Sequence, residues 1–273
     1  MSLNGTTGNC ALEDYPEDIK NPSAMVYTNG AVLACGGREL EAATRCWRFD
    51  SSTWSPLSNS SEGHCARDSP SVMVNDGWWV TGRTHAGYNK CTDSPTSELY
   101  DGQSWIPGPA LPQNEYDKFS CVANLNTTHT MIIGGYYASS DAWLYNWRTL
   151  EWTQTDSLIS GRRVHGCVSL GDQGVLVAGG SEDHTVELYD PVLGTWSTQP
   201  SLPEELDPIF PTLLNWEGQV LALIYQEEEI YQRSNETGEW SVLEGVRLPE
   251  DFDGYDANPA VLVPDNWPCN PVE

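Results

Sequence analysis

The sequence is poor in basic residues and has no long hydrophobic stretch. Only 13 of its 273 residues are Lys or Arg, against 39 Asp or Glu, so the formal net charge is −26. Such an acidic surface repels phosphate backbones and anionic lipids, and we expect no nucleic-acid partner. No apolar run approaches the roughly 20 residues of a membrane helix, so membrane insertion is not expected. Residues 1–20 lack the apolar core of a signal peptide, and Met1 is expected to begin a mature chain.

Phenylalanine is scarce, with 4 residues, but Trp and Tyr number 12 each, which is typical of a globular chain with a buried core. The eight Cys include no Cys-x-x-Cys pair, which argues against zinc and favours disulfides. Together with the low Lys count and four glycosylation sequons, this favours a secreted, extracellular protein; a reduced cytosolic protein is the alternative. The sequons begin at Asn4, Asn59, Asn126 and Asn235.

Five segments of the chain share one pattern. Each has an apolar run, often ending in Gly-Gly, followed by an aromatic residue and then by a Trp. Four of the aromatic residues are Tyr and one is Phe, and Asp follows three of the five. The Trp residues of successive copies are 51, 47, 44 and 44 positions apart. The aromatic residue and the Trp of each copy are Phe49 and Trp54, Tyr100 and Trp105, Tyr145 and Trp152, Tyr189 and Trp196, and Tyr231 and Trp240.

This pattern resembles the kelch repeat, and the resemblance spans nearly the whole chain. It implies a β-propeller in which each blade is a four-stranded sheet, with strands a (innermost) to d (outermost). The residues agree independently, because short β-branched and aromatic runs alternate with turns rich in Gly, Pro, Asn and Asp. In this arrangement the repeat Tyr, Phe and Trp pack between blades, and Gly-Gly permits positive φ where strand b ends.

The two ends of the chain predict how the ring closes. Residues 2–10 align with the end of strand c and strand d of a repeat, and residues 259–263 align with a strand a. We therefore expect one all-β domain, a six-bladed propeller whose last blade is shared by both termini; a five-bladed ring is the alternative. The expected blades are residues 22–63, 64–113, 114–160, 161–204, 205–250, and 251–273 with 1–21.

Loops of a propeller lie on two faces because the strands alternate in direction. Most sequons fall in a–b or c–d turns, which leaves the b–c/d–a face uncovered, and this face holds the longest predicted loop, residues 83–96. The resemblance implies that partners commonly bind there. Six residues align with one another in the d–a links, and salt bridging between blades is the alternative to a ligand-binding role for them. They are Lys20, Asp68, Asp117, Arg163, Asp207 and Asp256. The candidate ligand-binding residues are Arg38, Arg83, His85, Tyr88, Lys90, Tyr136, Tyr137, Asp183, His184, Arg163, Asp68, Asp117 and Asp207.

We find no convincing catalytic set. The five His do not assemble the ligands of a copper-radical oxidase, and no nucleophile elbow is present. Arg162, Arg163 and His165 could serve a cofactor-free sugar isomerase, although they also fit an ordinary d–a link. The favoured function is an extracellular module that binds a protein or glycan, with no cofactor and no metal. A small-molecule enzyme at the channel mouth and a structural secreted protein are the alternatives.

The repeat alignment also predicts four disulfides. Cys35 ends a strand b and Cys46 begins the next strand c, so they face each other across one hairpin. Cys121 and Cys167 occupy matching positions in adjacent inner strands; two buried free thiols are the alternative for this pair. The remaining predicted pairs join a d–a link to the next b–c loop and the two ends of the chain. These pairs are Cys65–Cys91 and Cys10–Cys269.

Overall fold

The computed structural model describes residues 24–36, 43–50, 53–63, 70–75, 77–87, 90–112, 120–135, 140–180, 184–206, 210–224 and 227–247. These residues form five antiparallel sheets of four strands each. Blade one holds β1 (Ala24–Thr28), β2 (Ala31–Cys35), β3 (Cys46–Asp50) and β4 (Thr53–Pro56). Blade two holds β5 (Ser71–Val74), β6 (Gly77–Gly87), β7 (Lys90–Tyr100) and β8 (Trp105–Pro107).

The other three sheets repeat this order along the chain. Blade three holds β9 (Cys121–Asn126), β10 (His129–Ile133), β11 (Ala142–Asn146) and β12 (Glu151–Gln154). Blade four holds β13 (Gly166–Ser169), the short 3₁₀ helix η1 (Gly171–Gln173), β14 (Val175–Ala178), β15 (Val186–Asp190) and β16 (Thr195–Gln199). Blade five holds β17 (Pro211–Trp216), β18 (Gln219–Ile224), β19 (Glu229–Arg233) and β20 (Trp240–Arg247).

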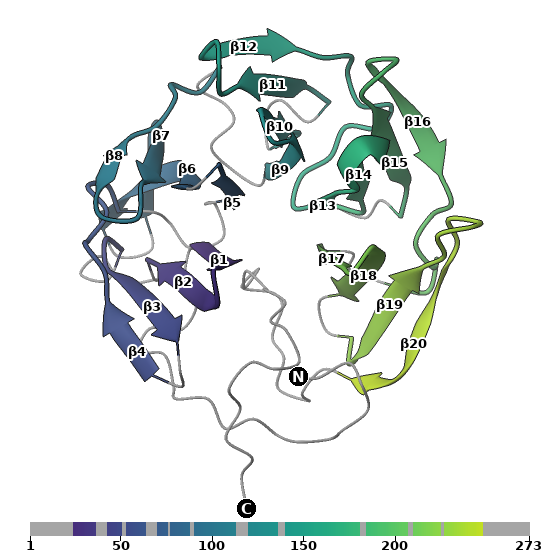
Figure 1. Cartoon of the computed structure of the whole chain (residues 1–273). Helices are drawn as coiled ribbons and strands as arrows, with labels where there is room; N and C mark the ends of the chain where they lie inside the picture. The colour runs from purple at the N-terminus through teal and green to yellow at the C-terminus, as the bar shows by residue number, and fades with distance from the viewer. Residues whose placement is uncertain are drawn as a thin grey trace, which may run out of the picture.

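The sheets stand around a common axis, with the first strand of each nearest the centre and the fourth at the rim (Figure 1). The protein is therefore an all-β β-propeller, as expected. The described residues form five blades, the number of the alternative prediction and not of the favoured six-bladed one. The residues assigned to a sixth blade, 1–21 and 251–273, lie outside the described part of the chain. No helix in the described part is long and apolar enough to cross a membrane.

The repeated aromatic residues form the core between blades, as predicted. In four of the five copies the Tyr or Phe on the third strand pairs across the sheet with the Trp on the fourth, as Tyr189 does with Trp196. In blade five the register differs, and Tyr231 pairs with Val242. The ring centroids of Tyr189 and Trp196 are 5.2 Å apart, a tilted contact that stabilises beyond simple area burial. Tyr189 is 5% exposed and packs against Met131 and Ile133 of the preceding blade. The motif is thus a packing device repeated once per blade.

The Gly pairs have the predicted positive φ and also allow a close approach of backbones. Gly179 and Gly180 have φ of 67° and 101°. A Cβ on Gly180 would lie 2.5 Å from the carbonyl oxygen of Arg163. Any larger residue would push the link between blades three and four out of place.

Two of the four predicted disulfides lie within the described residues, and both are confirmed. Cys35–Cys46 joins β2 to β3 inside blade one, with 4.1 Å between Cα atoms. Cys121–Cys167 joins the inner strands of blades three and four, with 6.0 Å between Cα atoms. Cys10, Cys65 and Cys269 lie outside the described residues, so Cys10–Cys269 and Cys65–Cys91 stay predictions.

One predicted loop is wrong. Residues 83–96 were expected to be irregular, but most of them extend β6 and β7, the two longest strands of the described chain at 11 residues each. The pairing continues from Gly82 with Thr96 to Gly87 with Lys90, with register shifts on either side of His85. Such bulges accommodate an extra residue and bend the strand.

Candidate functional site

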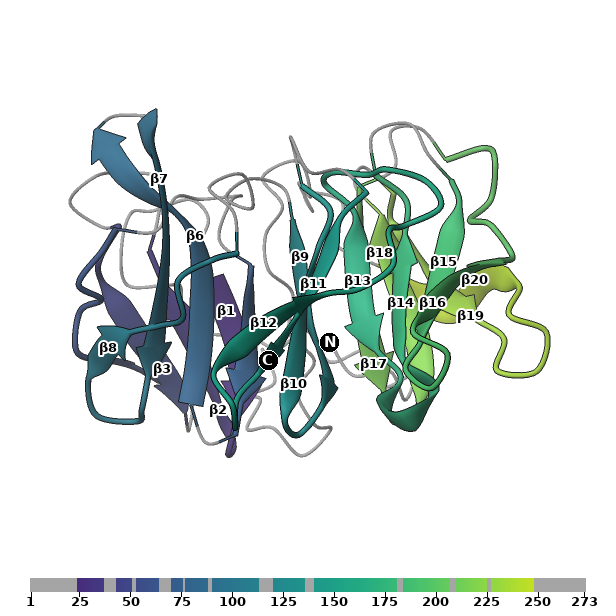
Figure 2. The same cartoon turned by 90° about the horizontal axis from the view of Figure 1, so that it is seen from above.

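The extended β6–β7 hairpin is the most prominent feature of the b–c/d–a face. It rises beyond the ends of the neighbouring sheets (Figure 2). Three candidate ligand-binding residues, Arg83, His85 and Lys90, lie on its two strands. The hairpin therefore carries these residues away from the body of the propeller on a paired scaffold, not on a flexible loop.

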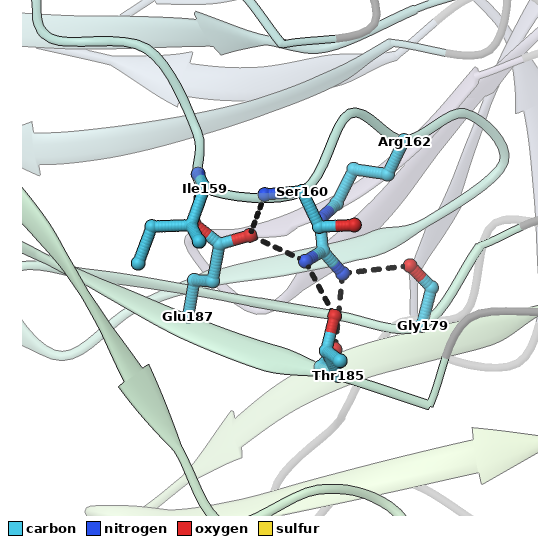
Figure 3. A network of polar contacts seen from close by, with 6 residues as sticks. All are labelled: Ile159, Ser160, Arg162, Gly179, Thr185 and Glu187. Atoms are coloured by element: carbon cyan, nitrogen blue, oxygen red, sulfur yellow. Dashed lines mark hydrogen bonds and ion pairs between the residues drawn. The ribbon is translucent and has the colours of Figure 1, made fainter.

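The link from blade three to blade four is the best-defined part of the same face. Figure 3 shows the guanidinium of Arg162 enclosed by protein groups. Its Nη1 donates to the carbonyl oxygens of Gly179 and Thr185, at 2.9 and 3.0 Å. Its Nη2 donates to Thr185 Oγ1 at 2.9 Å and to Glu187 Oε1 at 2.5 Å. Arg162 is 1% exposed, so its donors serve the fold and do not face a ligand.

Glu187 completes this network from the third strand of blade four. Its carboxylate accepts backbone N–H bonds from Ile159 at 2.7 Å and from Ser160 at 3.0 Å. The ion pair thus fastens the d–a link to both ends of the b–c connection next to it. A buried charge needs an oppositely charged partner, because an unpaired one would cost several kcal/mol.

The residues after Arg162 alternate between inward and outward. Arg163 is exposed on the face. Val164 has φ of 55°, a left-handed conformation that is rare for a β-branched residue and costs about 1–3 kcal/mol. His165 is again buried. The strained backbone at Val164 places a buried Arg and a buried His on either side of an exposed Arg.

His165 is held neutral by its surroundings. Burial, with a smaller contribution from the nearby Arg162 charge, lowers the pKa of its imidazole to about 3. Neither ring nitrogen has a hydrogen-bond partner in the described part of the chain. Its ring lies against Gly134, where a Cβ would come within 2.7 Å of Cε1. With Arg162 also enclosed, these residues are not arranged as the proton-transfer site of a sugar isomerase.

His184, another candidate, is occupied by an internal bond. It is half-buried, and its Nε2 lies 2.8 Å from the carbonyl oxygen of Leu206, in the link from blade four to blade five. Its main-chain carbonyl accepts a bond from Leu202 N at 2.9 Å. His184 therefore joins two blades at this rim.

Other candidates cannot be placed. The side chains of Arg83, His85 and Lys90 are not described, although their strands are. The remaining predicted residues of this face lie outside the described residues. They are Lys20, Arg38, Asp68, Tyr88, Asp117, Tyr136, Tyr137, Asp183, Asp207 and Asp256.

A buried Glu in blade two was not predicted. Glu98 is 3% exposed and accepts backbone N–H bonds from Ser61 at 3.0 Å and from Glu62 at 3.2 Å. It occupies the position of Glu187, two residues before the repeat Tyr. That shared position was the available signal in the sequence: a Glu on the third strand anchors the incoming d–a link.

The sequons that the structure describes are accessible, and two of the three lie away from this rim, whereas Asn59 lies in the d–a link between blades one and two. Asn59, Asn126 and Asn235 are exposed. Asn126 is in the β9–β10 turn, where its Oδ1 accepts bonds from the N–H and the hydroxyl of Thr128, both at 2.9 Å. Asn235 is in the β19–β20 turn. These two turns are on the face opposite to the β6–β7 hairpin, and Asn4 lies outside the described residues.

The described residues contain no group of three or more His, Cys, Asp or Glu side chains placed to hold a metal ion. The chain matches no protein-family model, and no curated protein matches it. The class of the protein, a β-propeller, therefore rests on its own geometry.

Proposed function

We propose that this protein is an extracellular interaction module, a kelch-type propeller of six blades that binds a protein or glycan partner through the b–c/d–a face. The observation that carries the proposal is the β6–β7 hairpin, which extends past the sheets on that face. Loops and hairpins on a rigid scaffold are the usual place for recognition residues. The hairpin carries Arg83 and Lys90, and Arg163 is exposed on the same face.

The rigidity of the rim supports a binding role. The buried Arg162–Glu187 network, the Gly pairs and the His184 bond hold the d–a and b–c connections of blades three to five in one arrangement. A preformed surface loses less conformational entropy on binding than a flexible one. The acidic chain adds a bias towards partners with basic patches, because complementary charge speeds encounter.

Two features support the extracellular location. The Cys35–Cys46 and Cys121–Cys167 disulfides are typical of proteins in oxidising compartments. The three described sequons have exposed Asn side chains, as a glycosylation site requires. Expression in a secreting eukaryotic cell, followed by glycosidase treatment, should reveal a mass shift, and Asn126→Gln should reduce it by one glycan. A secreted protein with no mass shift would contradict the glycosylation.

The face assignment can be tested with one truncation. Replacing residues 83–95 with Asn-Gly joins Gly82 to Thr96, a pair already in register, through a two-residue turn. Cys65→Ser accompanies it, so that the predicted partner of Cys91 is not left as a free thiol.

The wild-type protein and this variant are compared in a screen of extracellular proteins and a glycan array. Genuine hits should bind the variant at least about tenfold more weakly, which corresponds to about 1.4 kcal/mol. The matched control is Val192→Ser with Leu193→Ser in the β15–β16 turn, where both side chains are exposed on the opposite face. Binding lost in the control but kept by the truncated hairpin would reverse the face assignment.

A further inference from the structure

Blade five departs from the repeat on its two outer strands. In the other four blades the repeat Trp lies directly opposite the Tyr or Phe of the third strand. In blade five Tyr231 faces Val242, and Trp240 lies opposite Arg233 instead. Residues that lie directly opposite each other in a sheet point to the same face. Trp240 packs against the apolar core that includes Leu176 of blade four, so the side chain of Arg233 also points towards blade four.

The change of register coincides with the loss of a hydrogen bond between blades. In blades two, three and four the indole N–H of the repeat Trp donates to a backbone carbonyl oxygen just after the fourth strand of the preceding blade. Trp240 Nε1 is also buried, but it has no hydrogen-bond partner in the described part of the chain. The junction of blades four and five therefore has a donor without an acceptor. The bonds at the other three junctions are Trp105 to Ser58 at 2.9 Å, Trp152 to Ala110 at 2.8 Å, and Trp196 to Asp156 at 3.0 Å.

Arg233 adds further donors at the same junction. The residue is 9% exposed, and burial lowers the pKa of its guanidinium. Its Nη2 donates to Oε1 of Gln199, the last residue of β16, at 3.0 Å. Its Nε is buried without a hydrogen-bond partner, and the described chain provides no carboxylate that forms an ion pair with it. A guanidinium with five N–H donors thus makes one bond, to a neutral amide.

The other buried arginine shows what is missing. Arg162 also leaves its Nε without a partner, but it donates four bonds and one of them reaches the carboxylate of Glu187. Its charge is therefore paired. A buried charge without a counter-ion destabilises a fold, and this chain has 39 acidic residues from which one could be supplied. The absence of an anion beside Arg233, in the described part of the chain, indicates that one comes from solution.

The geometry of the guanidinium favours an anion with two oxygens. Its Nε and Nη2 N–H groups form a side-on fork that matches two oxygens of a carboxylate, a phosphate or a sulfate. The single amide oxygen of Gln199 occupies half of this fork. A Cβ at Gly238 would lie 2.8 Å from Nη2 and 3.2 Å from Pro200 Cδ, so this glycine leaves room for the guanidinium between the β19–β20 turn and blade four.

We infer that Arg233 binds a small oxyanion at the outer rim, beside the unpartnered indole N–H of Trp240. In Figure 1 the end of β16 lies next to the turn between β19 and β20, where this site is located. The anion takes the place of the Gln199 amide oxygen and gives both arms of the fork an acceptor. The site uses no residue of the b–c/d–a face, and the inference does not depend on the proposed function.

Thermal denaturation of the full chain at pH 7 and constant ionic strength tests the inference. Sodium chloride is replaced in steps by inorganic phosphate, by sulfate or by acetate. Phosphate and sulfate stabilise proteins in general by exclusion from their surface, so the quantity that counts is the difference between the wild-type protein and Arg233→Met. At ten times the dissociation constant, the melting temperature of the wild-type protein should rise by about 2–5 °C more than that of Arg233→Met.

Two further variants make the test specific to this site. Arg48→Met is the matched control, because the side chain of Arg48 is 38% exposed, and it should keep the full anion response. Gln199→Glu places a carboxylate beside Arg233, so it should melt at a higher temperature than the wild-type protein in chloride and lose most of the response to added anions.

The behaviour in chloride alone separates an anion site from a packing role. Arg233→Met should melt there at the same temperature as the wild-type protein or above it, because an apolar side chain replaces an unpaired charge. Equal responses of the wild-type protein and Arg233→Met to all three anions would overturn the inference. Arg233→Met melting several degrees lower in every salt would also overturn it. A response to phosphate and sulfate without acetate would assign a tetrahedral oxyanion, and a response to acetate would assign a carboxylate.

Discussion

Two ion pairs of this propeller have the same N–O distance and opposite environments. Arg162–Glu187 and Arg48–Asp50 both measure 2.5 Å, but the first pair has side chains 0% and 2% exposed and the second 38% and 40%. Burial should decide their importance, because breaking a buried pair strands a charge, whereas an exposed charge is solvated by water. We expect Glu187→Gln to cost about 3–5 kcal/mol and Asp50→Asn below about 1 kcal/mol.

The contacts of Glu187 explain the larger value. Its two oxygens accept three bonds, from Ile159 N–H, Ser160 N–H and Arg162, so each oxygen already faces a donor. Glutamine keeps the shape but offers one oxygen and one NH₂ group, which must then face a donor. The Arg162 charge also loses its partner while it stays buried. Both penalties act in the folded state only, and they therefore reduce the free energy of unfolding.

Thermal denaturation followed by circular dichroism measures the difference. For a domain of this size, the loss in Glu187→Gln corresponds to a melting temperature about 6–20 °C lower. Arg162→Met combined with Glu187→Gln should be milder than the sum of the two single changes, since the double variant contains no stranded charge. Similar small effects for Glu187→Gln and Asp50→Asn would refute the reasoning.

Three further predictions concern the link between blades three and four. The pKa of His165 is lowered to about 3 in the folded state and is near 6.5 when unfolded, so below pH 6.5 the unfolded chain binds a proton that the folded protein does not. The free energy of unfolding should therefore fall by about 1.4 kcal/mol per pH unit between pH 6 and 4. Denaturant titrations at pH 7 and 5 should show a smaller fall in this free energy for His165→Gln than for the wild-type protein. Gly134→Ala should lower the free energy of unfolding by about 1–3 kcal/mol, since φ is 61° and the new Cβ would meet His165. Gly102→Ala is the control, because a Cβ there would have nothing within 4 Å, and it should lower the melting temperature less than Gly134→Ala does. Replacing Cys121 and Cys167 together with Ala should cost about 4 kcal/mol in the chain-entropy model, since the bridge spans 46 residues, and an unchanged midpoint in denaturant would contradict it.

The propeller could be predicted because its repeat is local. Tyr189 and Trp196 are seven residues apart and face each other across one tight hairpin, so their spacing alone reports two paired strands. The same holds for Cys35 and Cys46, which are opposite each other in the register of β2 and β3. A repeat of this kind can be recognised in a single sequence, because each copy is compared with the other copies in the same chain.

The parts that the sequence did not reveal depend on contacts between distant segments. Arg162 and Glu187 are 25 residues apart and lie in different elements. The residues around each of them do not indicate that the two side chains form an ion pair. The β6–β7 extension was mistaken for a loop because its polar residues and Pro95 are typical of loops. The structure pairs Pro95 with Arg83 next to a register shift, where a ladder tolerates a residue without an N–H group.

Several kinds of contact tie blade three to blade four. Blades three and four share an apolar core, the Cys121–Cys167 bridge near the axis and the Arg162–Glu187 network at the rim, where Glu187 also holds Ile159 and Ser160. In Figure 1 this junction lies across the ring from the opening between blades one and five. Because the bridge holds the inner strands and the ion pair holds the links at the rim, the two blades are fixed to each other at both radii. We therefore expect the b–c/d–a rim of blades three and four to keep its geometry when one of these ties is removed.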